Sequence, residues 1–514
     1  MTLSNQKSFA EACVSGLKWN YAGAVIRALS SMVITIVLAR LLGPEPFGLV
    51  AIAWIVVGLG NLVADLGLGP ALVQRTTISD ADVRYTFTMQ VCMGLALMTV
   101  VALSAPVLTV IFQQPKVVPV VRALSCLFVL QTFGVVAVAL LTRAMDFRGI
   151  QSARIASYLV GFLALGIPLA LLGLEVWSLV IAQLAQAAVF SILSYRQVRH
   201  PLTPLFRATS RGVNSFGLKV LSTNLVNYAI SSLDSFFIGR FFDVVILGLY
   251  NRAFILVSTP INTLVITVQK VLFPAYSQMQ HDPQTVRRAH LAGVGFMAMV
   301  MVPVYGCVAV VPGTIIAGLF GPEWADAIPF LVPLALAMPF HAIMATGGPM
   351  LWAKNLVGRE LIAQLCTACI FLAILVVTAR VSATALVWGV FVGTVARFVL
   401  ITHASLRTVG ASWSSLLRSA SGSLVLLVPT AGVVFFTNQI IAEWHVAPFP
   451  LLAADILVGT GVVVGVILWV PQLVFSQEMC WLADHLMDRL PGPVRMLMHR
   501  GALRPSVLGQ SLDG

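Results

Sequence analysis

Long apolar stretches separated by short polar turns run through almost the whole chain of 514 residues. A stretch of about 20 apolar residues is long enough to cross the hydrocarbon core of a bilayer as a helix. The pattern therefore predicts an all-α integral membrane protein with about 14 transmembrane helices. We place these helices at residues 17–41, 47–68, 85–112, 118–141, 150–173, 176–196, 216–240, 244–270, 289–319, 327–352, 358–379, 383–405, 418–442 and 448–473.

Two parts of the chain, residues 16–53 and 217–253, have similar sequences. The segment Gly16-Leu17-Lys18-Trp19 returns as Gly217-Leu218-Lys219-Val220, and Gly48-Leu49 returns as Gly248-Leu249. A repeat of this length is a whole helical bundle, not a solenoid unit. In membrane proteins, two such bundles commonly face each other across a central cavity, which is the arrangement of a transporter. A chance match between two apolar helices is the alternative explanation.

Six spans before the second copy give both copies the same orientation, so we expect a parallel repeat. Lys and Arg gather in the loops on the side of the N-terminus, which predicts that both termini are cytoplasmic. The predicted organisation is an N-terminal six-helix bundle at 1–196, a basic cytoplasmic linker at 197–215, a C-terminal six-helix bundle at 216–405, two additional transmembrane helices at 406–474, and a cytoplasmic amphipathic helix with a disordered tail at 475–514.

The composition agrees with a membrane protein. Hydrophobic residues make up 59% of the chain and charged residues only 10%, against about 25% charged residues in soluble domains. The net charge of +12 does not indicate a nucleic-acid-binding protein, because the basic residues are scattered among short loops and form no stripe.

Several polar side chains lie inside the predicted spans, where a charge costs at least about 2.5–3.5 kcal/mol unless it faces a partner or water. Arg27 and Asp234 lie in the first helices of the two predicted halves and Arg252 lies in the eighth span. For these three a cavity position and an inter-helix bond remain equal alternatives. For other polar residues we favour inter-helix bonds; these include Gln131, Gln183, Gln186, His341 and Asp455.

The sequence contains no GxxxxGK[ST], GxSxG or HExxH motif, so it offers no ATP-binding loop, hydrolase nucleophile or zinc-protease site. Cys366 and Cys369 form a CxxC inside a predicted span, which favours packing over redox or zinc chemistry. We therefore expect no enzyme activity, no cofactor and no metal site.

Some segments are similar to a known family. They are Val37-Leu38-Ala39-Arg40-Leu41-Leu42-Gly43-Pro44, Ala64-Asp65-Leu66-Gly67, Leu140-Leu141-Thr142-Arg143-Ala144-Met145-Asp146-Phe147-Arg148 and Gly248-Leu249-Tyr250-Asn251-Arg252-Ala253. They resemble bacterial polysaccharide transporters, in the exopolysaccharide (colanic-acid-like) branch of the multidrug/oligosaccharidyl-lipid/polysaccharide exporter superfamily. The resemblance is dense over residues 16–280 and mostly architectural beyond them.

The resemblance implies a flippase that moves undecaprenyl-pyrophosphate-linked oligosaccharide repeat units from the inner to the outer leaflet of the bacterial inner membrane. It implies membrane lipids, the polysaccharide polymerase and the export machinery as partners, and no nucleic acid. On this basis the substrate-binding candidates are Arg27, Arg252, Arg397, Asn224, Asn227 and Tyr228, where an arginine would receive pyrophosphate. The ion-coupling candidates are Asp234 and Asp65.

Three other functions remain open at this point. The first is an ion-coupled multidrug exporter of the same superfamily, although a cationic cavity suits cationic drugs poorly. The second is a membrane enzyme such as a sugar polymerase, which would need a large outer loop or loop carboxylates. The third is a scaffold of a polysaccharide assembly complex, which would need no charge at mid-membrane.

Overall fold

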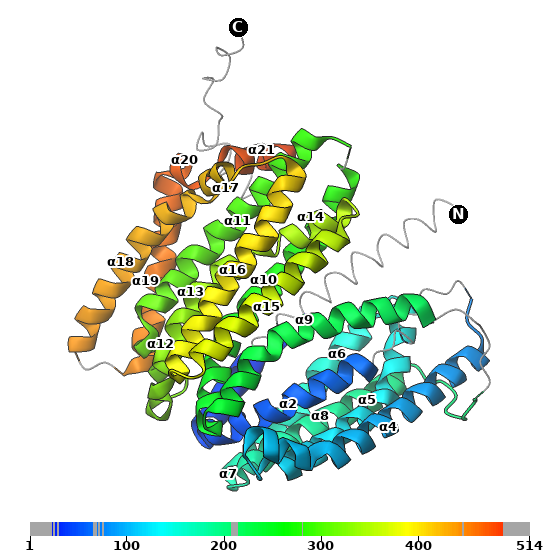
Figure 1. Ribbon diagram of the computed structural model, residues 1–514. Coiled ribbons are helices and arrows are strands. Elements are labelled where there is room, and N and C mark those ends of the chain that lie inside the picture. Colours follow the sequence, from blue (N-terminus) through cyan, green and yellow to red (C-terminus); the bar gives the residue numbers. More distant parts are fainter. Residues whose placement is uncertain are drawn as a thin grey trace. The chain divides into compact units, whose positions relative to one another are not determined.

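The computed structural model describes residues 30–64, 77–206, 214–279, 281–444 and 447–486, together with the isolated positions Gly23, Ile26, Arg27, Gly69, Leu72 and Val73. The chain folds into two compact units, Met1–Asn251 (unit 1) and Arg252–Gly514 (unit 2). Within the described residues every regular element is helical, as predicted, and Figure 1 shows the helices coloured along the sequence. The predicted domain boundaries at 197 and 216 stay predictions.

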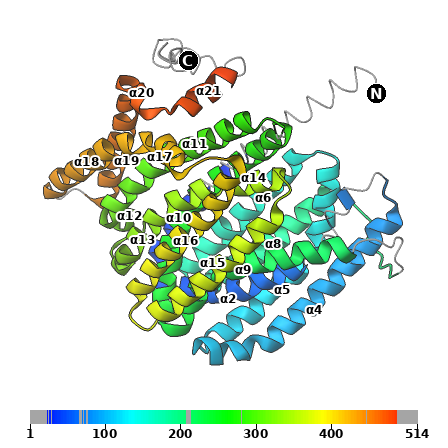
Figure 2. The same cartoon turned by 45° about the horizontal axis from the view of Figure 1, so that its top comes forward.

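Unit 1 is a bundle of long helices in which neighbours along the chain run antiparallel. Among its closest helix pairs are α4 with α5 and α5 with α8, which Figures 1 and 2 show side by side. The unit also contains a π-helix, η1, which continues α6 into α7. Its elements are α2 (Pro44–Ala64), α4 (Asp80–Phe112), α5 (Val117–Arg143), α6 (Phe147–Tyr158), η1 (Leu159–Gly166), α7 (Ile167–Leu171), α8 (Glu175–Gln197), α9 (Asn214–Phe241) and the start of α10 (Val244–Gln278).

Unit 2 combines long helices with several short ones that begin at prolines. The predicted span 289–319 is two helices, because the backbone leaves the helical conformation at Val311 and Pro312 starts a new helix. Its further elements are α11 (Pro283–Val310), α12 (Pro312–Leu319), η2 (Pro322–Ala327), α13 (Ile328–Met344), α14 (Gly347–Ala353), α15 (Val357–Thr378), α16 (Ala383–Val409), α17 (Trp413–Ala420), α18 (Gly422–Glu443), α19 (Pro448–Trp469), α20 (Pro471–Val474) and α21 (Gln477–Leu486).

Within the described residues, 12 helices are long and apolar enough to cross a membrane. The chain is therefore a multi-pass membrane protein. Two predicted spans are not among the 12. The described part of the first is the short apolar helix Ser30–Leu42. The seventh is α9, which has 28 residues but falls short in apolar character because of its Asn, Ser and Asp residues. The number 14 thus stays a prediction.

Two glycines bring α2 and the start of α10 into backbone contact inside unit 1. A Cβ on Gly48 would lie 1.9 Å from the carbonyl oxygen of Val244, and a Cβ on Gly248 would lie 2.0 Å from that of Pro44. Only glycine allows such a close approach of two backbones. Gly48 and Gly248 are matching positions of the predicted duplication, and each contacts the residue four positions before the other. This reciprocity supports the duplication, which is still a prediction.

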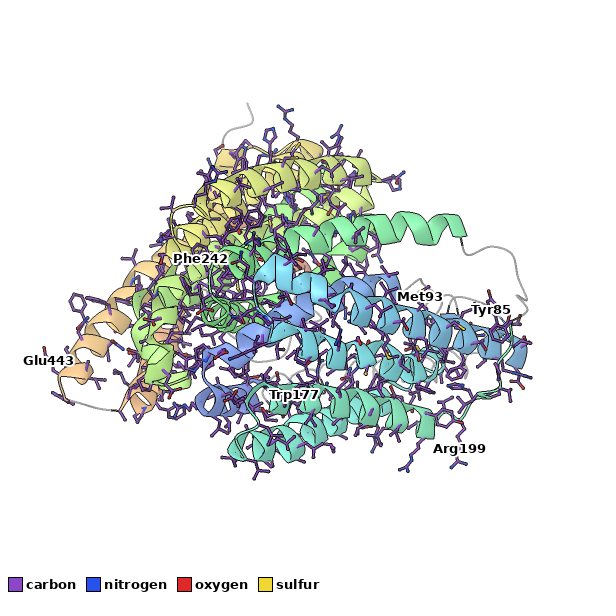
Figure 3. All side chains as sticks on the ribbon, turned by 60° about the horizontal axis from the view of Figure 1, so that its bottom comes forward. Tyr85, Met93, Trp177, Arg199, Phe242 and Glu443 are labelled. Atoms are coloured by element: carbon purple, nitrogen blue, oxygen red, sulfur yellow. The ribbon has the colours of Figure 1, made fainter. Side chains whose placement is uncertain are left out.

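The ends of unit 1 can be followed in Figure 3. Tyr85, near the start of α4, lies at the same end of the bundle as Arg199, just after α8, whereas Trp177, at the start of α8, lies toward the other end. The chain after α8 then packs along α4, where the Leu205 N–H donates to Thr88 Oγ1 at 2.8 Å. The first residues of the predicted linker therefore cover this basic end of unit 1, which we call the linker end.

The predicted amphipathic helix corresponds in part to α21, which packs on α11 in unit 2. The Ser419 hydroxyl donates to Glu478 at 3.2 Å, and Trp481 packs against a core cluster that includes Tyr276 and Met350. The predicted disordered tail lies outside the described residues.

Candidate functional site: a cationic cavity in unit 1

Unit 1 contains a cavity of about 920 Å³, a volume within the range of about 300–1,000 Å³ that is typical of ligand pockets. Its wall combines apolar and aromatic side chains, among them Trp54, Phe128 and Phe190, with a set of polar ones. None of its described lining residues is acidic. The polar lining residues are Arg27, Asn61, Gln90, Gln131, Thr132, Thr142, Arg154, Ser157, Gln183 and Gln186.

Two arginines give this cavity its charge. Arg27, predicted from the sequence, is exposed and lines it. Arg154 reaches it from α6, where its guanidinium lies 5.9 Å from the centre of the Phe190 ring, a distance at which a cation is attracted to an aromatic face. The charges of Arg27 and Arg154 repel each other. An anion bound between them would relieve this repulsion, because like charges interact strongly away from bulk water.

The lining hydroxyls and the lining carboxamides differ in their hydrogen bonds. The hydroxyls donate to carbonyl oxygens of their own helices: Thr132 to Val129 at 2.7 Å, Thr142 to Val138 at 2.7 Å and Ser157 to Arg154 at 3.0 Å. In contrast, Gln90 Nε2 and Gln183 Oε1 are buried without a hydrogen-bond partner among the described residues. Both amide atoms are shielded from solvent, so neither is open to a ligand in the cavity.

The remaining candidates of unit 1 lie away from the cavity lining. Tyr228 of α9 donates its hydroxyl to the carbonyl oxygens of Trp54 and Ile55 in α2, each at 3.0 Å. It thus packs behind the wall to which Trp54 belongs. Asn227 is exposed on α9. The side chain of Asn224 and the whole of Asp65 lie outside the described residues.

Asp234 is a buried carboxylate with 5% of its surface exposed. One of its oxygens accepts a hydrogen bond from the Tyr250 hydroxyl, and the other accepts from the Ser235 N–H at 2.7 Å. The structure thus places Asp234 between α9 and α10, apart from the cavity lining.

Unit 2 holds the other two arginine candidates. Arg252 lies half-buried in α10, and Arg397 lies half-buried in α16. The charge of Arg397 is attracted by that of Glu360 at the start of α15, and Glu360 accepts a hydrogen bond from the indole N–H of Trp352. Arg397 therefore has an acidic neighbour, unlike the arginines of the cavity.

The sequence analysis did not single out Arg154, and it did not place three glutamines at a cavity. Arg154 lies seven residues after the start of α6, about 10 Å along the helix axis. Gln131, Gln183 and Gln186, which we took as inter-helix bonds, line the cavity. Asp455 does form the expected inter-helix bond, accepting from Asn438 at 2.6 Å. A signal for Arg154 was available, since Ser157 follows at the spacing that places both on one helix face.

The polysaccharide biosynthesis protein family matches residues 37–329, more than half of the chain. The chain belongs to this family. This result confirms the resemblance that the sequence motifs indicated, and it covers all described helices that line the cavity except for the segment around Arg27.

Two curated proteins of polysaccharide biosynthesis are similar in sequence to the chain. It is 27% identical over 298 residues to the teichuronic acid biosynthesis protein TuaB of Bacillus subtilis, a match that spans 57% of this chain and 62% of TuaB. It is 29% identical over 304 residues to the succinoglycan biosynthesis transport protein ExoT of Rhizobium meliloti, spanning 59% of this chain and 61% of ExoT.

The fold of this polysaccharide biosynthesis protein is also found in a solved structure. Its structure is similar to that of the lipid II flippase MurJ, with a TM-score of 0.67 over 89% of this chain and 99% of MurJ. The sequence identity is 13%, so this likeness concerns the fold alone. It shows an all-helical membrane fold, as the sequence predicted.

Proposed function

We propose that this protein moves undecaprenyl-pyrophosphate-linked oligosaccharide units from the inner to the outer leaflet of the bacterial inner membrane, for exopolysaccharide or lipopolysaccharide synthesis. The observation that carries the proposal is the pair of cavity arginines, Arg27 and Arg154, without an acidic residue among the described lining. Guanidinium groups bind phosphate oxygens through two parallel hydrogen bonds. The family membership and the names of TuaB and ExoT support a role in polysaccharide assembly.

The mechanism we propose follows from the cost of moving a charged headgroup through hydrocarbon. The pyrophosphate exchanges water for the guanidinium groups of Arg27 and Arg154 while the prenyl chain stays in lipid. The two predicted halves then rock so that the cavity opens to the opposite side, as in transporters with internal repeats. Both termini remain in the cytoplasm.

Asp234 is our candidate for the coupling ion site, with Asp65 as the second. A buried carboxylate inside a membrane helix is a typical proton or cation carrier, and Asp234 has a hydroxyl donor, Tyr250, on one oxygen. We expect Asp234→Asn to retain substrate binding and to lose the response of transport to an imposed proton or sodium gradient. An unchanged response in Asp234→Asn vesicles would remove Asp234 from the mechanism.

The competing function is export of small cationic drugs. The lining of the cavity argues against it, because Arg27 and Arg154 repel cations and no described lining residue is acidic to attract them. The polysaccharide polymerase and export proteins remain proposed partners. They would act on the lipid-linked unit that the flippase delivers to the outer leaflet.

Deletion of the gene in its native host tests the proposal. We expect loss of surface polysaccharide, with labelled lipid-linked repeat units retained in the inner leaflet. Expression of the wild-type chain should restore the polymer, and expression of Arg27→Ala at equal protein level should not. Normal polymer in the deletion strain together with altered sensitivity to cationic drugs would support the exporter instead.

A further inference from the structure

Gly23 lies in close contact with α6. It is buried, and a Cβ on it would lie 2.7 Å from the Cβ and 2.9 Å from the Cγ of Gln151. Gln151 is itself buried in α6, with 5% of its surface exposed. Two Cβ atoms do not approach to 2.7 Å, so only glycine at position 23 allows this contact.

The two cavity arginines lie one helical turn beyond this contact. Gly23 and Arg27 are both helical, and residues four apart on a helix share a face. Arg154 follows Gln151 by three residues in α6, which places these two on one face as well. Arg27 and Arg154 both line the cavity, and the charge of one acts on the other. The contact between Gly23 and Gln151 therefore sets how far apart the two guanidinium groups lie.

Two cations at a set separation suit an anion with two charged groups. One guanidinium binds the oxygens of one phosphate through two parallel hydrogen bonds. A diphosphate carries two phosphates joined by a bridging oxygen and can engage both guanidinium groups, whereas a monophosphate ester offers a single phosphate. The repulsion between Arg27 and Arg154 further favours the ligand with the larger negative charge.

We propose that Gly23 is a positioning residue, which holds Arg27 close enough to Arg154 for the pair to bind one diphosphate in preference to a monophosphate. The inference rests on the proposed function and deepens it, because it assigns the selectivity for the pyrophosphate linkage to a single residue. A Cβ at position 23 would push Arg27 away from Arg154 and leave each arginine to bind a phosphate alone.

Binding measurements with two defined lipids test the selectivity. The purified full-length protein is titrated with undecaprenyl pyrophosphate and with undecaprenyl monophosphate. We expect the wild-type protein to bind the pyrophosphate lipid about tenfold more tightly, as one additional charge-assisted contact would give. Equal affinity for the two lipids would overturn the proposed selectivity.

Gly23→Ala tests the role of the glycine. This variant should lose about tenfold in affinity for the pyrophosphate lipid and less than about threefold for the monophosphate lipid. Alanine is a better helix former than glycine, so helix propensity alone would act in the opposite direction. Gly432→Ala in α18 of unit 2 is the matched control and should keep both affinities, because a Cβ there meets no atom within 4 Å.

A compensating change identifies the contact as the cause. Gln151→Gly removes the Cβ that would clash, so the double variant Gly23→Ala/Gln151→Gly should recover most of the lost affinity for the pyrophosphate lipid. A folded double variant that binds as weakly as Gly23→Ala would overturn the assignment to this contact. Gln151→Val, whose branched Cβ crowds the same contact from α6, replaces Gly23→Ala if the latter does not fold.

The outcomes distinguish the role of Gly23 from the function it rests on. Wild-type affinity of Gly23→Ala for both lipids, or an equal loss for both, would overturn the positioning role and leave the flippase proposal standing. Failure of the wild-type protein to bind either lipid would contradict the proposed function itself.

Discussion

Unit 1 and unit 2 treat a membrane-embedded arginine in opposite ways. Arg27 and Arg154 share a cavity of about 920 Å³ with no acidic residue among the described lining. Arg397 of unit 2 lies near the carboxylate of Glu360, which attracts it. The charge of an arginine with an acidic neighbour is compensated inside the protein, whereas two arginines that repel each other, with no acidic residue among the described lining, favour a bound anion. The contrast teaches that the surroundings of an intramembrane charge, more than its presence, indicate a binding site.

The largest effect should come from exchanging the arginine side chain in each unit. Arg154→Gln should reduce transport of the lipid-linked unit about tenfold to a hundredfold, because hydrogen bonds to charged groups contribute about 1.5–3 kcal/mol. Arg397→Gln is the matched change in unit 2. It should reduce transport less than threefold, because the carboxylate of Glu360 already compensates the charge of Arg397. The transport rates of both variants are measured in vesicles. Equal losses in the two variants would contradict the proposed difference between the arginines of unit 1 and unit 2.

A glycine packed against a ring of the cavity wall gives the next largest effect. A Cβ on Gly60 would lie 2.3 Å from the Phe128 ring, which is buried and lines the cavity. Gly60→Ala should therefore lower the free energy of unfolding by about 1–3 kcal/mol and reduce substrate affinity by displacing this ring. Gly461→Ala in unit 2 is the control, because a Cβ there meets no atom within 4 Å. Thermal unfolding in detergent measures both, and equal stabilities would show that this wall is not tightly packed.

A smaller effect is expected from removing the acidic neighbour of Arg397. Glu360→Gln leaves the guanidinium without its opposite charge and should lower the free energy of unfolding by about 1 kcal/mol. The double variant Glu360→Gln/Arg397→Gln should recover part of this loss, because the unpaired charge is then gone. Additive losses in thermal unfolding would mean that the two side chains do not interact, and Arg397 would then be available to a ligand.

The smallest effect is a pH dependence that differs between the units. Burial against Phe87 and Tyr195 lowers the pKa of His200 from its ordinary 6.5. As the pH falls, His200 is therefore protonated in the unfolded chain at a higher pH than in the folded chain. The stability of unit 1 should therefore fall as the pH drops below about 6.5. Hydrogen bonding to Thr285 lowers the pKa of Asp282 from 3.8. The stability that the ionised Asp282 gives to unit 2 is therefore lost only as the pH falls below that value.

Melting temperatures measured from pH 8 to pH 5 check this difference. His200→Gln should flatten the curve across that interval, and Asp282→Asn should leave its shape unchanged. A wild-type curve that is already flat from pH 8 to pH 5 would contradict the assignment to His200.

The sequence predicted the class of fold because apolar stretches of membrane length dominate it, and 12 of the predicted spans have apolar helices as counterparts. It was less reliable at α9, where polar residues interrupt the apolar pattern, and it did not reveal the π-helix Leu159–Gly166, whose hydrogen bonding depends on the packed neighbours. The break between α11 and α12 was also missed, although Pro312 marks it.

For the site, the sequence predicted Arg27 because a charge deep in an apolar span is conspicuous. Arg154 was not predicted because it follows a basic loop. Its depth in the bundle depends on the residue at which α6 begins, and the sequence does not define that residue sharply. Gln90 and Gln183 could not be assigned from the sequence, since a glutamine that bonds to a neighbouring helix and one that faces a cavity have the same pattern. Only the arrangement of α4, α5, α6 and α8 separates the two cases.

The central claim is that the cavity of unit 1 binds the pyrophosphate of a lipid-linked sugar during its transfer between leaflets. The most direct test reconstitutes purified wild-type and Arg154→Gln protein in vesicles with labelled undecaprenyl-pyrophosphoryl oligosaccharide and follows its appearance in the opposite leaflet. We predict transfer by the wild-type protein and a loss of about tenfold or more in the variant. Equal transfer by both proteins, at equal amounts of folded protein, would contradict the account.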